Sequence, residues 1–151
     1  RWGVSSGADI AALGTSDTVA VSLPGTPFGL AEKDYTPAQK LIAADAYFAL
    51  ATDCNPGTTW NESMQFIIAL ACRAMKITPA QAIAAATINS AHAIRRSDSI
   101  GSIEVSKQAD MLILNVPEYR HLGYRYGTNL VRQVIKRGRV YSVDVGYYRT
   151  T

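Results

Sequence analysis

Two short apolar runs, each followed at once by a turn, constrain the fold of this 151-residue chain most strongly. Residues 17–23 read DTVAVSL and residues 47–52 read YFALAT, and both have the length and composition of buried strands. Between them, Thr36 and Pro37 predict a helix start, with Thr36 as the N-cap and Pro37 in the first helical position. This alternation of strand and helix favours an α/β fold with parallel strands. The chain is shorter than the roughly 200 residues that a complete eightfold barrel needs.

Further helices are expected after the second strand. Thr59 and Glu62 have the spacing of a capping box and predict a helix start. Thr78 and Gln81 repeat this pattern ahead of an alanine-rich helix, and a short helical turn is expected near residues 90–94. Ahead of the first strand, the segment that ends at Gly14 resembles the end of another helix.

The pattern changes near residue 97. Four later segments are β-like: 103–105, 111–116, 131–136 and 140–143. The last two predict a hairpin around Arg137 and Gly138. We therefore expect two portions, an α/β portion over residues 1–97 and a β-rich portion over residues 98–151.

Charge and cysteine content limit the classes of partner. The net charge of +3 is low for a nucleic-acid binder, and no apolar run approaches the roughly 18 residues that span a bilayer. Six basic residues fall close together near the end: Arg120, Arg125, Arg132, Lys136, Arg137 and Arg139. A solvated surface explains this cluster better than a phosphate-binding face does. Cys54 and Cys72, with no secretory pattern ahead of them, indicate reduced thiols and a cytoplasmic location.

The residues after the second strand are the strongest candidates for chemistry. Ligands of parallel α/β folds bind at the carboxyl ends of the strands, where Asp53 stands. A carboxylate there could ligate a divalent metal ion and accept a proton from water. An aspartate that only caps the following turn is the alternative, and the local sequence leaves both open. Cys54 alternates with Asp53 and is expected to pack on the opposite side of the strand.

The loop that follows Asp53 has the composition of a binding loop. Asn55 offers an amide, Gly57 permits close backbone approach, and Thr58 precedes a helix start that favours anions. An ordinary turn is again the alternative. His92 and His121 lie at no predicted strand end and are better explained as surface or hydrogen-bonded side chains. Because the chain has no His-x-His or Cys-x-x-Cys pair, it cannot complete a metal site alone.

Residues 49–58, with Glu62-Ser63-Met64-Gln65 after them, resemble the last barrel strand and loop of the imidazolonepropionases, a family of metal-dependent amidohydrolases. Further segments also resemble this family: 18–25, 78–91, 100–110, 124–127 and 131–136. The resemblance extends over about residues 15–143, and the Asp-x-Asn-Pro-Gly-Thr loop is its specific part.

This resemblance implies an α/β fold built from the last strands and helices of a TIM-like (β/α)8 amidohydrolase barrel, followed by part of a small β-sandwich domain. It also implies a hydrolase that opens the cyclic amide of a small molecule, 4-imidazolone-5-propanoate, to N-formimidoyl-L-glutamate in histidine degradation. By position, Asp53 matches the metal ligand that also handles the proton of the attacking water. Asn55 and Gly57 match residues that hold the glutamate-like product, and Thr58 matches one that contacts the imidazolone.

Departures from the family pattern indicate a partial enzyme. The expected cofactor is Zn²⁺ or an Fe ion, but the family's metal-binding histidines are absent from this chain. Residues 7–10 lack the histidine of an Ala-Asp-His substrate contact, and Ser106 stands where the superfamily usually has glycine. We therefore expect a missing N-terminal barrel portion and no activity of this piece alone, with a homodimer as a candidate assembly.

Two other interpretations stay open. One is another cyclic amidohydrolase or deaminase of the same superfamily, although the loop from Asn55 to Thr58 argues against it. The other is a non-catalytic assembly or binding module that uses the basic residues and uncovered strand edges. Salt-dependent binding to nucleic acid would favour that module, but we expect neither a nucleic-acid nor a membrane partner.

Overall fold

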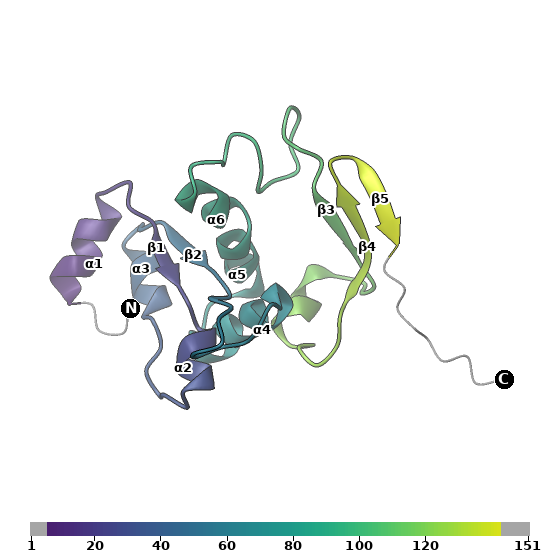
Figure 1. Ribbon diagram of the computed structural model, residues 1–151. Helices are drawn as coiled ribbons and strands as arrows, with labels where there is room; N and C mark the ends of the chain where they lie inside the picture. The colour runs from purple at the N-terminus through teal and green to yellow at the C-terminus, as the bar shows by residue number, and fades with distance from the viewer. Residues whose placement is uncertain (1–5, 143–151) are drawn as a thin grey trace.

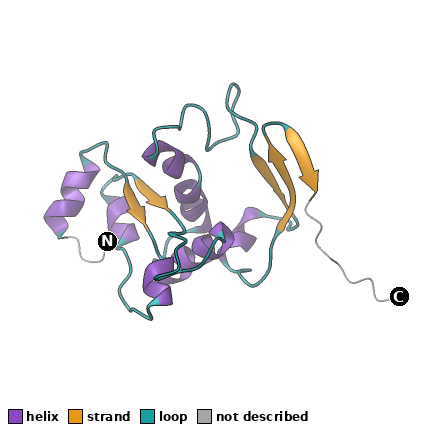
Figure 2. Cartoon of the chain, viewed as in Figure 1, coloured by secondary structure: helices purple, strands orange, loops and turns teal. Residues whose placement is uncertain are grey.

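The computed structural model describes residues 6–142. Helices and a pair of parallel strands come first in the chain, and a small antiparallel sheet follows (Figures 1 and 2). The elements of the first part are α1 (Gly7–Gly14), β1 (Ala20–Ser22), α2 (Gly25–Gly29), α3 (Ala38–Ala43), β2 (Phe48–Leu50), α4 (Met64–Ala74), α5 (Pro79–Ala86) and α6 (Ile88–Ala93). Those of the second part are β3 (Met111–Leu114), the 3₁₀ helix η1 (Tyr119–Gly123), β4 (Val131–Lys136) and β5 (Arg139–Ser142).

The parallel pairing expected from the strand–helix alternation is confirmed. β1 and β2 run parallel, with Ala20 opposite Phe48, although each strand has only three residues. Every residue of β2 is buried. Leu50 of β2, Leu41 of α3 and Ile67 of α4 are among the largest fully buried side chains. The core therefore forms where helices cover the two strands.

The edge of β2 that faces away from β1 is covered by polar side chains of α6. Asn89 Nδ2 donates to the carbonyl oxygen of Phe48 at 2.8 Å, and Ser90 Oγ donates to that of Leu50 at 2.9 Å. These bonds satisfy backbone acceptors that would otherwise be left without partners in the core. α6 is thus fixed against the strand that leads to Asp53.

Two of the three predicted helix starts are wrong in position. α4 begins after Ser63, whose Oγ accepts a hydrogen bond from the Phe66 N–H at 3.2 Å. Thr59 is buried in the loop instead, and its carbonyl oxygen accepts from the Asn55 N–H at 2.9 Å, so it does not form a capping box with Glu62.

α3 starts one residue later than predicted, with Pro37 as its N-cap. Thr36 does not cap the helix, because its Oγ1 accepts a hydrogen bond from Ser22 Oγ at 2.8 Å. The capping box of α5 is confirmed: Thr78 Oγ1 accepts from the Gln81 N–H at 3.3 Å, and Gln81 Oε1 accepts from the Thr78 N–H at 2.9 Å.

The antiparallel sheet has the strand order β3-β4-β5. The predicted hairpin turn is confirmed, since Arg137 and Gly138 have φ of 50° and 76° and link β4 to β5. Such turns need positive φ at both central positions, which glycine adopts at little cost. The predicted last strand included Val143, which lies outside the described residues.

The strand predicted at residues 103–105 is wrong. Ile103 and Val105 are 82% and 96% exposed, and no strand of the described chain pairs with them. Lys107 Nζ donates to Ser102 Oγ at 2.6 Å and to Glu104 Oε1 at 3.2 Å, which closes this segment as a turn. A β-like composition therefore did not produce a strand without a neighbour to pair with.

The exposure of the six clustered basic residues agrees with the prediction that they form a solvated surface. All six of its residues are exposed, and two of them form ion pairs, Arg120 with Glu118 and Lys136 with Asp110. Between residues 6 and 142, no helix has the length and hydropathy needed to cross a membrane.

Candidate functional site

The loops at the carboxyl ends of β1 and β2 lie against each other beside a cavity of about 420 Å³. Two glycines of α2 allow this approach. A Cβ at Gly25 would lie 2.9 Å from Thr59 Oγ1, and one at Gly29 would lie 2.2 Å from the Thr58 carbonyl oxygen. Seven polar residues line the cavity: Ser22, Thr26, Glu32, Asp34, Thr36, Asp53 and Thr58. The cavity thus joins two loops that are far apart in sequence.

Asp53 is half-buried and lines this cavity, at the carboxyl end of β2 where the sequence places it. Its Oδ2 accepts a hydrogen bond from Thr26 Oγ1 at 2.9 Å. Within residues 6–142, Asp53 Oδ1 has no hydrogen-bond partner, and the side chain does not cap the following turn. The carboxylate is therefore held by one oxygen and keeps the other available to a ligand.

The backbone of Asp53 adopts φ of +51°, a left-handed conformation that is uncommon outside glycine. This conformation breaks the side-chain alternation of the strand. Cys54 is consequently exposed, and the expectation that it packs behind the strand is wrong.

Asn55 holds the loop together through its side chain. Asn55 Oδ1 accepts hydrogen bonds from the N–H groups of Gly57 and Thr58, both at 2.9 Å. Asn55 Nδ2 donates to the Asp53 carbonyl oxygen at 2.6 Å and to Thr58 Oγ1 at 3.1 Å. In the described chain, Thr58 lines the cavity but Asn55 and Gly57 do not.

Five polar residues of the cavity were not predicted from the sequence as site residues: Ser22, Thr26, Glu32, Asp34 and Thr36. One signal could have identified Thr26, because it follows the first strand and a Pro-Gly pair as Asp53 follows the second strand. Applying the carboxyl-end rule to both strands would have brought the two residues together. No local pattern marks Glu32 or Asp34, which follow α2 in a loop.

The donor set of the cavity fits one ligand of a metal site. Among the residues that the structure describes, no three His, Cys, Asp or Glu side chains come together around a common point. The carboxylate of Asp53 has one oxygen without a hydrogen bond among the described residues, and Zn²⁺ and iron both accept carboxylate oxygens as ligands.

The two histidines lie away from the cavity, and each has a polar partner. His92 Nε2 lies 3.1 Å from Asp17 Oδ1, and its ring packs against Tyr47 with centroids 4.5 Å apart. Asp17 and Tyr47 precede β1 and β2, so His92 lies at the amino ends of the strands. A ring nitrogen of His121 lies 3.0 Å from the hydroxyl of Tyr124. Both histidines are hydrogen-bonded, as expected.

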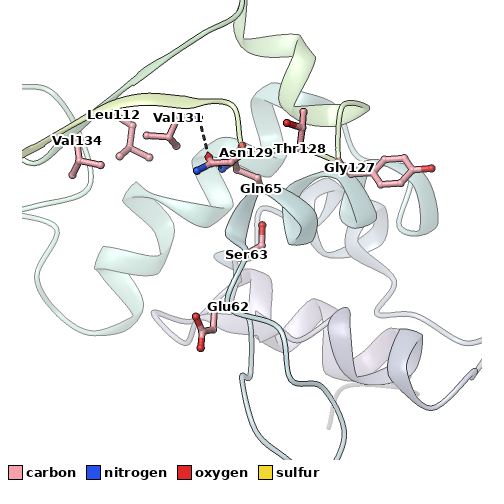
Figure 3. Close-up of a pocket in the computed structure, with 10 residues that line it drawn as sticks. Glu62, Ser63, Gln65, Leu112, Gly127, Thr128, Asn129, Val131 and Val134 are labelled. Atoms are coloured by element: carbon pink, nitrogen blue, oxygen red, sulfur yellow. Dashed lines mark hydrogen bonds between the residues drawn. The ribbon is translucent and has the colours of Figure 1, made fainter. Parts of the chain in front are cut away.

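A second cavity, of about 570 Å³, lies where the start of α4 faces the antiparallel sheet (Figure 3). Gln65 of α4 donates through Nε2 to Asn129 Oδ1 at 2.8 Å, and its Oε1 accepts from the Leu130 N–H at 2.9 Å. Asn129 Oδ1 also accepts from the Val131 N–H at 2.9 Å, the bond drawn in Figure 3. These contacts link the two parts of the chain.

Asp110 anchors the β4–β5 hairpin. The side chain of Lys136 and the backbone N–H of Arg137, the latter at 2.8 Å, donate to its carboxylate. These two hydrogen bonds, that of Lys136 first, lower the pKa of Asp110 to about 2. The carboxylate therefore stabilises the hairpin through its charged form.

Comparisons with known proteins identify relatives of the chain. A family model described as "Amidohydrolase family" matches residues 9–141. The chain is 57% identical over 131 residues to the imidazolonepropionase of Herpetosiphon aurantiacus. The aligned region covers 87% of this chain and 31% of that protein. It is 52% identical over 122 residues to the imidazolonepropionase of a Geobacillus species, and this aligned region covers 81% of this chain and 28% of that protein. The chain thus spans about a third of the length of these relatives.

A solved structure shows the same fold. The zinc-bound adenosine deaminase from Xanthomonas campestris matches with a TM-score of 0.74 and 24% sequence identity. The match covers 94% of this chain and 36% of that protein. This similarity establishes a mixed α/β amidohydrolase fold and carries no information on the substrate of this chain.

Proposed function

The chain belongs to the amidohydrolase family, and we propose that it is part of an imidazolonepropionase. The complete protein would hydrolyse the cyclic amide of 4-imidazolone-5-propanoate to N-formimidoyl-L-glutamate in histidine degradation. The observation that carries this proposal is the 57% identity to a protein of that name over most of this chain. The half-buried carboxylate of Asp53, with one oxygen free beside a cavity, supports it.

The remaining parts of the active site would come from the rest of the protein. We propose that β1 and β2 are the last two strands of a TIM-like (β/α)8 barrel, and that residues 1–97 belong to it. Residues 98–151 would form part of a small β-sandwich domain. The parallel strands with their helices and the antiparallel sheet support this division, and the chain's share of its relatives leaves room for the missing strands.

The proposed cofactor is a Zn²⁺ or Fe ion, with Asp53 as one of its ligands. Within residues 6–142, no three suitable side chains lie close enough together to hold a metal ion. The other ligands of the ion would therefore lie outside these residues. When bound, such an ion acidifies a water molecule and polarises the carbonyl of the substrate. The bound zinc of the adenosine deaminase from Xanthomonas campestris supports a metal cofactor.

The residues of this chain would then position reactants and move a proton. Asp53 would accept the proton of the attacking water, while its Oδ2 stays held by Thr26. Thr58, which lines the cavity, would contact the imidazolone ring. Asn55 and Gly57 would hold the glutamate-like product. That role requires the loop to exchange an internal hydrogen bond for the ligand, because Asn55 Oδ1 already accepts from Gly57 and Thr58.

An Asp53→Asn variant of the full-length protein tests the proposal. Loss of the proton acceptor and metal ligand should lower kcat about 10²–10⁴-fold. Asp45→Asn is a matched control, because Asp45 also has positive φ, is exposed and lies ahead of β2 instead of after it. Equal activity of the two variants would contradict the proposed role of Asp53. Turnover of other cyclic amides or of adenosine, in place of the imidazolone, would favour another activity of the family.

The same assay tests the dependence on the rest of the protein. The 151-residue chain with added Zn²⁺ should not hydrolyse the imidazolone. Turnover by this piece would show that the missing ligands are not needed.

We also propose a cytoplasmic location and a homodimer. Both cysteines are free thiols, which supports a reducing compartment. The homodimer rests on the family resemblance alone, and analytical ultracentrifugation of the full-length protein measures it.

A further inference from the structure

We propose that Thr26 is a positioning residue for Asp53, holding one carboxylate oxygen so that the other stays free for the metal ion. This inference rests on the proposed function, because it assigns Asp53 the role of metal ligand. Thr26 follows the segment 18–25 that resembles the family and is not part of it.

The evidence begins with the hydrogen bond between the two side chains. Thr26 Oγ1 donates to Asp53 Oδ2 at 2.9 Å, across a sequence separation of 27 residues. A bond to a charged carboxylate is stronger than one between neutral groups. Within residues 6–142, no other hydrogen bond reaches either carboxylate oxygen, so Thr26 alone determines which oxygen is occupied.

The backbone on the Thr26 side of this bond is fixed. The Thr26 N–H donates to the Leu23 carbonyl oxygen at 3.1 Å, in the turn that starts α2. Gly25 and Gly29, on either side of Thr26, lie so close to the second loop that a Cβ would be 2.9 Å from Thr59 Oγ1 and 2.2 Å from the Thr58 carbonyl oxygen. The hydroxyl of Thr26 is therefore placed by two close contacts between the loops.

The Asp53 side of the bond is also fixed. Its carbonyl oxygen accepts from Asn55 Nδ2 at 2.6 Å, which pins the left-handed backbone from which the carboxylate projects. With both backbones held, the bond restricts rotation of the carboxylate. Outer partners of this kind orient metal ligands, and their loss typically costs 10–100-fold in metal affinity or activity.

Substitutions in the full-length protein test the inference. Thr26→Val keeps the shape of the side chain and removes the hydroxyl, whereas Thr26→Ser keeps the hydroxyl. We expect Thr26→Val to weaken Zn²⁺ affinity, measured by competition with a chelator, about tenfold and to lower kcat by a similar factor with little change in KM. Thr26→Ser should restore both to within about threefold of wild type. Thr18→Val is the control, because Thr18 lies at the amino end of β1, away from Asp53.

Each outcome decides the inference. Zinc affinity of Thr26→Val within twofold of wild type overturns it, as does equal damage from Thr26→Ser and Thr26→Ala, which would indicate packing of the methyl group. If Thr26→Val does not fold, the contrast between the serine and alanine variants decides. If the wild type binds no divalent metal, or Asp53→Asn binds it as tightly, the proposed function fails and the inference falls with it. If Asp53→Asn weakens zinc binding as expected but Thr26→Val does not, only the positioning role of Thr26 is rejected, and the proposed function stands.

Discussion

The side-chain nitrogen of Asn55 donates a 2.6 Å hydrogen bond to the carbonyl oxygen of Asp53. The oxygen of the same side chain accepts hydrogen bonds from the N–H groups of Gly57 and Thr58. Asn55 thus holds the residues on both sides of it in one conformation. The left-handed backbone of Asp53, of a type that costs about 1–3 kcal/mol, persists because this network fixes it.

Replacing Asn55 should therefore loosen the loop. Asn55→Ala removes the acceptor and the donor, and we expect the free energy of unfolding of the full-length protein to fall by about 1–3 kcal/mol. Asn55→Asp keeps an acceptor for the two N–H groups and loses the nitrogen that donates to the Asp53 carbonyl oxygen and to Thr58 Oγ1, so its loss of stability should be smaller. Urea unfolding measures both variants. A loss in Asn55→Asp as large as in Asn55→Ala would mean that the two bonds donated by the Asn55 nitrogen carry the whole effect.

Gly29→Ala should separate the two loops of the candidate site. A Cβ there would lie 2.2 Å from the Thr58 carbonyl oxygen, so the backbone must move, at a cost of about 1–3 kcal/mol. The movement would also change the separation of Thr26 and Asp53 and reduce kcat of the full-length protein. Gly127→Ala is the control, since no atom of residues 6–142, apart from its chain neighbours, lies within 4 Å of its Cβ position. Stability of Gly29→Ala equal to that of Gly127→Ala would contradict the tight approach seen here.

The sequence predicted those parts of the fold whose causes are local. The Thr78–Gln81 capping box and the Arg137-Gly138 turn formed as expected, because each depends on residues within one turn of the backbone. The capping box expected at Thr59 failed because a competing contact, between the Asn55 N–H and the Thr59 carbonyl oxygen, keeps that residue in the loop. The hydrophobic periodicity of the sequence does not reveal this competing contact.

The candidate site was only half accessible to sequence reasoning. Asp53 could be placed because a strand end is readable from a short apolar run followed by a turn. Its contact with Thr26 depends on how the two loops pack, and that packing depends on the close approach permitted at Gly25 and Gly29. The internal bonding of Asn55 was also hidden, since the same Asn-Pro-Gly composition suits a binding loop and an ordinary turn.

Gln65 should control the link between α4 and the antiparallel sheet. Leu130 is buried, so Gln65→Ala leaves its N–H without an acceptor and should cost about 1–3 kcal/mol of stability. Gln65→Glu keeps the acceptor for Leu130 and loses the donor to Asn129, so it should retain most of the stability. Hydrogen exchange of the Leu130 amide in the full-length protein reports this directly. Unchanged exchange in Gln65→Ala would show that the contact does not hold β4.

Asp110 should make the stability of the hairpin depend on pH in the acid range. Its pKa is about 2 in the folded chain, below the ordinary 3.8, because Lys136 and the Arg137 N–H bond its charged form. A group with a lowered folded pKa stabilises the fold above its unfolded pKa and loses that effect as the pH falls through the folded value. The stability difference between wild type and Asp110→Asn should therefore be full above about pH 5 and shrink toward pH 2.

Urea unfolding of the full-length protein between pH 2 and pH 7 measures this dependence. Asp45→Asn is the control, because that exposed carboxylate has no hydrogen bond to the residues between 6 and 142. Lys136→Gln should raise the pKa of Asp110 toward its ordinary value in an NMR titration, since Lys136 is the largest cause of the shift. A constant difference between wild type and Asp110→Asn across this range would mean that the hairpin is held by packing and not by the charged carboxylate.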